Sequence, residues 1–473
     1  MNSKIKKFAK NVSYTFLANF LSIIVSTVLI LIVPGFIGAD DYGYWQLYIF
    51  YTSYISYMSL GLTDGAYLRY GGCEYNELNK PVFVSQYWFL VTFDIVVNFS
   101  IALFYGSIST DTSKTIVVFL TCLTGILVVP RSLLTFMLQA TNRIKEFSII
   151  IILERIIYFI LVIIFLLSGI RQFEYLIYAD VIGKFFSVLY SFFVCKELVF
   201  GKFAPMKISM REIWLNISVG SRLLFANFAN ILIIGIVRFG IENNWGIETF
   251  GKVSLTLSIS NMLMLFINAL AVILFPALRR TSEQNLPAIY KMMRIIIIIP
   301  LLGLLIFYYP AKVILSAWLP QYAESLTYMA LLFPMCLYES KMLLLINTYL
   351  KTLRKEKLML VINLITVGIS VVLTFISVFI LNSLNLTILL IIFLLAFRSV
   401  IAELCLTKVF KIQVKKDIIL EIIMTVFFIF VSWYLNIRVA LIAYSIAYVV
   451  YLISKKNDIV YLLRNIKKFL NSK

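Results

Sequence analysis

Long apolar stretches follow one another along almost the entire chain, and no other feature of the sequence constrains the fold as strongly. A helix needs about 20 apolar residues to cross a hydrocarbon layer about 30 Å thick. Stretches of that length recur from residue 12 to residue 454, and the breaks between them are too short for a soluble domain. With 62% hydrophobic and 14% charged residues, the sequence predicts an all-α, multi-pass integral membrane protein.

Charge clusters and Gly, Pro or Asn breaks divide the chain into about fourteen transmembrane helices. The expected spans are 12–33, 43–63, 82–106, 114–138, 147–168, 175–196, 214–238, 249–276, 290–310, 323–350, 358–381, 386–408, 418–435 and 439–454.

Lysine and arginine residues outside the spans lie almost all in alternate loops and in the two tails. The opposite loops hold only Lys114, Arg171, Arg238, Lys312 and Arg438. Because short loops rich in Lys and Arg stay in the cytoplasm, we expect both termini to be cytoplasmic. Membrane orientation thus accounts for the net charge of +19, and we expect no nucleic-acid partner.

The cysteine and histidine content argues against several classes of site. The five cysteines are odd in number and scattered, which disfavours a disulfide framework or a CxxC metal site. Histidine is absent, so Ser/His and Cys/His nucleophile pairs and histidine metal ligands are excluded. We expect no cofactor, no metal and no enzymatic step.

Short landmarks recur 208 residues apart. Ala18-Asn19-Phe20 matches Ala226-Asn227-Phe228, and Tyr42-Gly43 matches Phe250-Gly251. Chance matches are the alternative in so apolar a chain. A duplication predicts two parallel six-helix bundles followed by two further helices. Residues 1–200 would then form an N-lobe, residues 201–411 a C-lobe, and residues 412–473 helices 13 and 14 with a basic cytoplasmic tail.

Ionisable residues inside membrane spans are costly, by about 2.5 to 3.5 kcal/mol at a helix centre, and are functional-site hypotheses by default. The candidates for binding an anionic substrate are the cations Arg131, Arg155, Lys184, Arg222, Lys341 and Arg398. The candidates for coupling to Na⁺ or H⁺ are the acids Asp94, Asp180, Glu339 and Glu403. Lys252 and Arg294 lie near span ends, where we expect them to reach the membrane interface.

Structural roles remain open for several of these charges. Asp180 and Lys184 are four residues apart, so they could form an ion pair within one helix. Arg222 lies on a small, polar helix face with Ser218, Ala226 and Asn230. That face would suit a hydrated cavity, and a packing role for a snorkelling arginine is the alternative.

Three motifs resemble a known family. They are "FLANFLSIIVSTVLILIVPGFIGADDYGYWQL" after the basic start, "LGLTDGAYLRYGG" after the second span, and "LFPALRR" after the eighth. They are similar to the Wzx-type flippases of O-antigen and capsule repeat units, within the multidrug/oligosaccharidyl-lipid/polysaccharide exporter superfamily.

The resemblance implies transfer of an undecaprenyl-pyrophosphate-linked oligosaccharide across the bacterial cytoplasmic membrane by alternating access. The implied partners are this lipid-linked substrate, membrane lipids and polysaccharide-assembly proteins, with a monomeric transporter. Related peptidoglycan-precursor flippases carry an arginine in the first helix, whereas no charge lies between Asn11 and Val33 here.

Two other functions compete with a flippase. A multidrug cation antiporter of the same superfamily would favour an acidic, aromatic cavity, but the charge surplus inside the spans is basic. A membrane polysaccharide polymerase or acyltransferase would need larger outside loops than the roughly dozen residues expected here.

Overall fold

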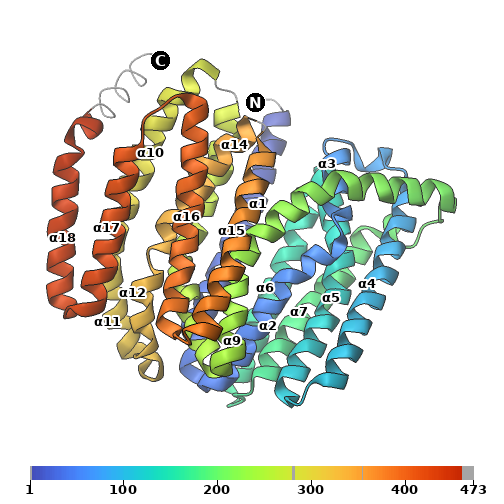
Figure 1. The fold of residues 1–473 in the computed structure, drawn as a ribbon. Coiled ribbons are helices and arrows are strands. Elements are labelled where there is room, and N and C mark those ends of the chain that lie inside the picture. The colour runs from blue at the N-terminus through green and yellow to red at the C-terminus, as the bar shows by residue number, and fades with distance from the viewer. Residues whose placement is uncertain (1–2, 280–282, 354, 461–473) are drawn as a thin grey trace. The chain divides into compact units, whose positions relative to one another are not determined.

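The computed structural model describes residues 3–279, 283–353 and 355–460. The chain divides into two compact units, Met1–Phe228 and Ala229–Lys473. The sequence predicts the end of the N-lobe at residue 200, whereas the first unit ends at Phe228, within a long helix. Helices make up almost all of the described residues, and none of these residues lies in a strand (Figure 1).

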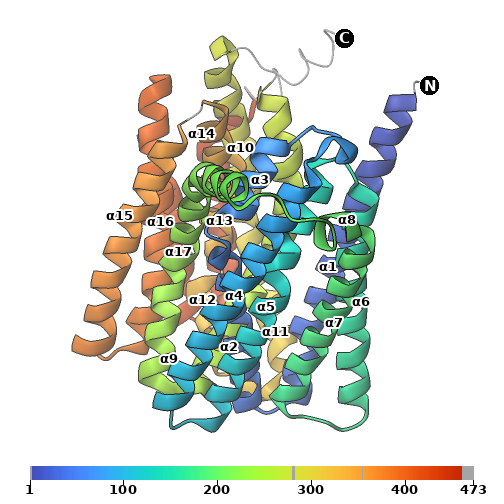
Figure 2. The ribbon, with the colours of Figure 1, turned by 90° about the vertical axis from the view of Figure 1, so that its right-hand side faces the viewer.

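The first unit is a bundle of long helices. In both views α4 to α7 run side by side (Figures 1 and 2), and α6 packs against both α7 and α1. Its elements are α1 (Ser3–Phe36), α2 (Ala39–Ile55), α3 (Leu62–Tyr70), α4 (Lys80–Ile108), α5 (Thr112–Ala140), α6 (Ile144–Leu167), α7 (Phe173–Val194), α8 (Lys196–Val199) and the first part of α9 (Met206–Arg279).

The second unit surrounds a segment that is mostly buried, residues Ser325–Thr352. That segment contains α12 (Met329–Leu332), α13 (Met335–Ser340), a π-helical stretch over Lys341–Asn347 and α14 (Thr348–Thr352). The other elements are the rest of α9, α10 (Leu286–Leu304), α11 (Tyr308–Trp318), α15 (Glu356–Phe375), α16 (Leu384–Phe410), α17 (Lys415–Tyr434) and α18 (Ile437–Ser454).

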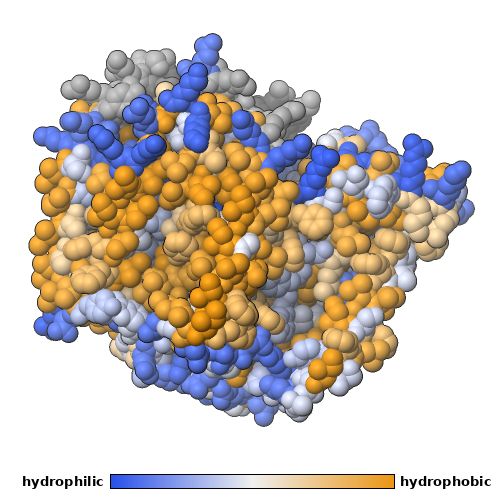
Figure 3. Space-filling model, viewed as in Figure 1, coloured by the Kyte–Doolittle hydropathy of each residue, from blue (hydrophilic) through white to orange (hydrophobic). Residues whose placement is uncertain are grey.

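The predicted all-α membrane fold with about fourteen helices is confirmed. Twelve helices of the described chain are long and apolar enough to span a membrane. One of them, Met206–Met262, covers two predicted spans, and α2, with 17 residues, covers another. Apolar side chains cover the middle of the visible face, and hydrophilic residues gather at the helix ends (Figure 3).

Two helix breaks match the spacing of the sequence landmarks. Gly38 precedes α2, and Gly246, with φ of 78°, interrupts α9. These glycines are 208 residues apart, as are the paired landmarks. Tyr42 and Phe250, which follow the two breaks, are both buried.

The motif "LGLTDGAYLRYGG" forms a tight contact within the first unit. After Gly61, which has φ of 84°, helix α3 lies against the first turns of α9. A Cβ at Gly65 would lie 1.8 Å from the carbonyl oxygen of Asn216, and one at Gly220 would lie 1.9 Å from that of Gly61. Glycine is required there because the two backbones touch.

Polar side chains fasten the same two helices together. Arg69 of α3 forms an ion pair of 2.9 Å with Glu212 and donates a hydrogen bond of 2.6 Å to Asn216. Asn216 in turn donates to Gln86 of α4 at 2.9 Å. These first turns of α9 run across the ends of the bundle helices in both ribbon views (Figures 1 and 2).

Candidate functional site

Six ionisable or hydroxyl side chains from α2, α5, α6 and α7 meet inside the first unit. Arg131 of α5 forms an ion pair with Glu154 of α6 and donates a second hydrogen bond to Ser187 of α7. Lys184 of α7 pairs with Asp180, so the ion pair that the sequence left open does form. Tyr48 of α2 donates a hydrogen bond of 2.6 Å to the same Asp180 carboxylate.

Cations outnumber carboxylates in this first cluster. Arg155 and Lys184 lie close enough to Glu154 to interact with it electrostatically, as Arg131 does. Three predicted substrate cations thus surround two carboxylates, Glu154 and Asp180. The Nε atom of Arg131 is buried and has no hydrogen-bond partner among the described residues. A buried donor of this kind can be satisfied by water or by a ligand.

Two further predicted residues of the first unit lie apart from this cluster. Arg222, on α9, is exposed and makes no ion pair within the described part of the chain. Asp94, on α4, is fully buried and accepts a hydrogen bond of 2.8 Å from Asn98. Its other carboxylate oxygen has no hydrogen-bond partner among the residues described.

The second unit contains a buried ion network of four side chains. Lys341 is fully buried, and its Nζ lies 2.6 Å from a Glu403 oxygen and 2.7 Å from a Glu421 oxygen. Arg294 lies 2.7 Å from Glu403 and 3.1 Å from Glu421. Tyr290 adds a hydrogen bond of 3.0 Å to Glu403. Two cations and two carboxylates therefore neutralise one another.

The expectation that Arg294 reaches the membrane interface is wrong. Its side chain is 6% exposed because two carboxylates hold it inside the unit. Glu421, in the second turn of α17, was not singled out from the sequence. An acid near the start of a span looks like an ordinary interfacial residue until its facing partners are known. The only hint of Glu421 in the sequence was that Arg294 and Lys341, two cations inside spans, had no assigned acidic partner.

Arg398 forms a separate buried pair. It donates one hydrogen bond of 2.7 Å to Glu339 and another to Asn230 of α9. Its Nε atom, like that of Arg131, lacks a partner among the described residues. Glu339 stays 21% exposed on its side chain, so this pair lies closer to the surface of its unit than Lys341 does.

The predicted site residues therefore form two clusters and one separate pair, and two of them lie outside these groups. Arg131, Arg155, Lys184 and Asp180 come together in the first unit, whereas Lys341 and Glu403 share the buried ion network of the second. Arg398 and Glu339 pair with each other. Arg222 and Asp94 make no ion pair with any described residue. Lys252 pairs with Glu248 near the helix surface.

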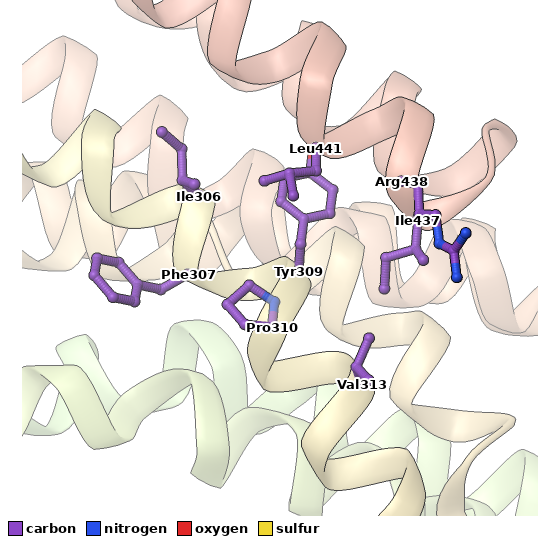
Figure 4. Close-up of a pocket in the computed structure, with 8 residues that line it drawn as sticks. All are labelled: Ile306, Phe307, Tyr309, Pro310, Val313, Ile437, Arg438 and Leu441. Carbon is purple, nitrogen blue, oxygen red and sulfur yellow. The ribbon is translucent and has the colours of Figure 1, made fainter.

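An apolar pocket of about 320 Å³ lies between α11 and α18. Figure 4 shows Tyr309, Pro310 and Val313 facing Ile437 and Leu441, with Arg438 at one edge. Such a lining suits a hydrocarbon chain better than a polar ligand. Among the described residues, no group of three or more Cys, Asp or Glu could hold a metal ion.

No protein-family model and no curated protein matches the sequence. Several solved structures match the fold. A lipid II flippase MurJ in an inward closed conformation aligns with a TM-score of 0.63 and 13% identity, over 95% of this chain and all of that one.

A multidrug resistance MATE family transporter of the MOP superfamily, in an inward-facing conformation, aligns with a TM-score of 0.62 and 10% identity, over 82% of this chain and 96% of that one. A MATE structure in complex with MaD3S aligns with a TM-score of 0.53 and 10% identity, over 84% of this chain.

The fold is that of the MOP-superfamily transporters. This likeness covers nearly the whole chain and therefore both units. At 10 to 13% identity it carries no information on the substrate.

Proposed function

We propose that this chain is a flippase for an undecaprenyl-pyrophosphate-linked oligosaccharide repeat unit, working from the inner to the outer leaflet of the bacterial cytoplasmic membrane. The observation that carries the proposal is the cationic surplus of the first cluster, where Arg131, Arg155 and Lys184 surround only two carboxylates. Guanidinium groups suit phosphate because they donate several charge-assisted hydrogen bonds in a fixed geometry.

Two chemical details support an anionic substrate over a cationic drug. Arg222 is exposed and makes no ion pair with any described residue, so its full charge is available to a ligand. The buried Nε of Arg131 also offers a free donor. A cationic drug would meet repulsion from these groups, whereas a pyrophosphate would be attracted to them.

The test is a strain that lacks the protein and is complemented with variants. In the strain without the protein, we expect lipid-linked repeat units to accumulate on the inner leaflet and surface polysaccharide to be lost. Arg155→Gln and Arg222→Gln should lower export about 10- to 100-fold, since a hydrogen bond to a charged group contributes about 1.5–3 kcal/mol. Arg155→Lys and Arg222→Lys should keep more activity, and Lys202→Gln, in an exposed loop, is the matched control.

Two outcomes would contradict the flippase. Repeat units that reach the outer face but stay unpolymerised would indicate a polymerase. Greater sensitivity to cationic drugs, with normal polysaccharide, would indicate a multidrug antiporter.

Coupling to an ion gradient is the second part of the proposal, and Asp94 is its best candidate. Asp180, Glu339 and Glu403 are each held by a cation, whereas Asp94 accepts a hydrogen bond only from Asn98 among the described side chains. Asp94→Asn should make export insensitive to dissipation of the Na⁺ or H⁺ gradient that drives the wild type. Unchanged gradient dependence in this variant would remove Asp94 from the mechanism.

A further inference from the structure

A large basic cavity opens at one end of the second unit. It measures about 770 Å³ and is bounded by the start of α10, the end of α16 and the start of α17, whose ends lie together at the top of Figure 1. Six cations line it, together with two acids, Asp417 and Asp458. The cations are Lys291, Arg294, Lys408, Lys411, Lys415 and Lys416.

Both acids of this cavity are held by a single lysine, Lys455. Lys455 forms ion pairs with Asp417 and with Asp458, the latter at 2.9 Å. Burial alone would lower the pKa of Lys455, but its hydrogen bonds to both carboxylates raise that pKa above its usual value. Arg294 also lies 3.5 Å from Asp417. With Lys455 included, six lysines face these two acids, so four positive charges remain unbalanced.

The five lysines have no ion-pair partner within the described chain. All except Lys291 come from a single stretch, residues 408–416, that turns between α16 and α17. The sequence beyond residue 460 contains no Asp or Glu that could balance them. Clustering like charges around an empty volume is unfavourable unless an anion or its counterions occupy it. The excess of lysines therefore favours occupation of the cavity by an anionic group.

The surroundings of the cavity indicate a lipid as the source of that anion. Ile419 and Ile423, one and two turns along α17 from Lys415, are 56% and 55% exposed. Ile296, beyond Lys291 on α10, is 49% exposed. Charged residues at the mouth followed by exposed aliphatic residues on the same helices match a phospholipid, with its phosphate at the interface and its acyl chains below.

We propose that this cavity is a binding site for the phosphate-bearing headgroup of an anionic phospholipid of the leaflet that faces the lysine-rich loops. Lys408, Lys411 and Lys415 hold the phosphate by charge-assisted hydrogen bonds. Arg294 forms the floor and connects the headgroup to the buried ion network through Glu403 and Glu421. The site is separate from the first cluster and does not depend on which substrate the protein transports.

The test measures lipid retention by the purified full-length chain. Native mass spectrometry would follow titration with phosphatidylglycerol and, in parallel, with zwitterionic phosphatidylcholine. We expect wild-type protein to retain phosphatidylglycerol preferentially and K408Q/K411Q/K415Q to lose at least about tenfold of that affinity. The control K196Q/K202Q/K207Q removes the same charge from exposed lysines of the first unit and should lose much less.

Two further measurements distinguish a lipid phosphate from a free phosphate and show whether the variants are folded. Inorganic pyrophosphate alone, added at equal concentration, should neither displace phosphatidylglycerol nor raise the melting temperature as much. If it does both, the lipid assignment is overturned. The charge-preserving K408R/K411R/K415R should retain the lipid. Equal retention of both lipids by wild type, or equal losses in the two glutamine variants, would also overturn the proposal.

Discussion

Four side chains with ionised ends lie together in the second unit, although each would be costly there alone. Lys341 is held by Glu403 and Glu421, and Arg294 bridges the same two carboxylates. Desolvation can cancel much of the attraction within such a network, but removing a single partner leaves a bare buried charge. Loss of one member should therefore cost more than loss of a matched pair.

Lys341→Met tests this reasoning. We expect it to destabilise the protein by about 3–5 kcal/mol, because two carboxylates then share only Arg294. The double variant Lys341→Met/Glu421→Gln restores charge balance and should recover most of the loss. The melting temperature in detergent measures both. Additive losses in the double variant would contradict the balanced network.

Two cysteines that follow helix ends, Cys195 after α7 and Cys73 after α3, should differ in reactivity. Cys195 is fully buried, and burial raises the pKa of its thiol to about 12, whereas Cys73 is partly exposed in the loop after α3. A maleimide should label Cys73 in the folded protein and reach Cys195 only after denaturation, because the thiolate is the reactive form. Single-cysteine variants followed by mass spectrometry would show this. Rapid labelling of Cys195 in the native state would contradict its packing.

Depth in a span identified charged residues from the sequence but could not assign their partners. Lys341 stood out because it lies mid-span, and Asp180 with Lys184 because four residues separate them. Arg294 was assigned to the interface and Glu421 was not singled out, because both lie close to span ends, where charges are ordinary. Their meeting depends on how α10 and α17 pack, which a single sequence does not reveal.

At the scale of elements, glycine sets the approach of α3 to α9. Gly65→Ala should destabilise the first unit by at least about 1–3 kcal/mol, because the new methyl group would overlap the backbone of Asn216. Gly220→Ala should behave likewise. Gly368→Ala is the control, since no atom lies within 4 Å of its added Cβ. That substitution should be neutral or stabilising by up to about 1 kcal/mol. Thermal unfolding separates the three, and equal melting temperatures would refute the close contact.

Apolar length located the helices well but not their irregularities. The ends of α4, α5, α6 and α16 lie within a few residues of the predicted spans. The sequence placed a full span at 43–63, whereas α2 ends at Ile55 and Gly61 turns the chain into α3. Hydropathy does not register such a turn, because its residues are nearly as apolar as those of a helix.

For the whole molecule, the lysine and arginine distribution predicts an even number of crossings. A green fluorescent protein fused after Lys473 should fluoresce, and alkaline phosphatase inserted after Ile170, between α6 and α7, should be active outside the cytoplasm. A reversed pattern of the two reporters would invert the orientation. It would also place the basic cavity of the second unit on the other leaflet.

The ion network of the second unit also bears on membrane insertion, because its cations are synthesised before its carboxylates. Lys341 precedes its partner Glu421 by 80 residues, and Arg294 precedes Glu403 by 109. At about 5–20 residues per second, a nascent chain would hold Lys341 without Glu421 for several seconds. An unpaired cation at a helix centre raises the free energy of membrane insertion by about 2.5–3.5 kcal/mol. We therefore expect α10 and the helix that carries Lys341 to stay beside the translocon until α16 and α17 bring their carboxylates.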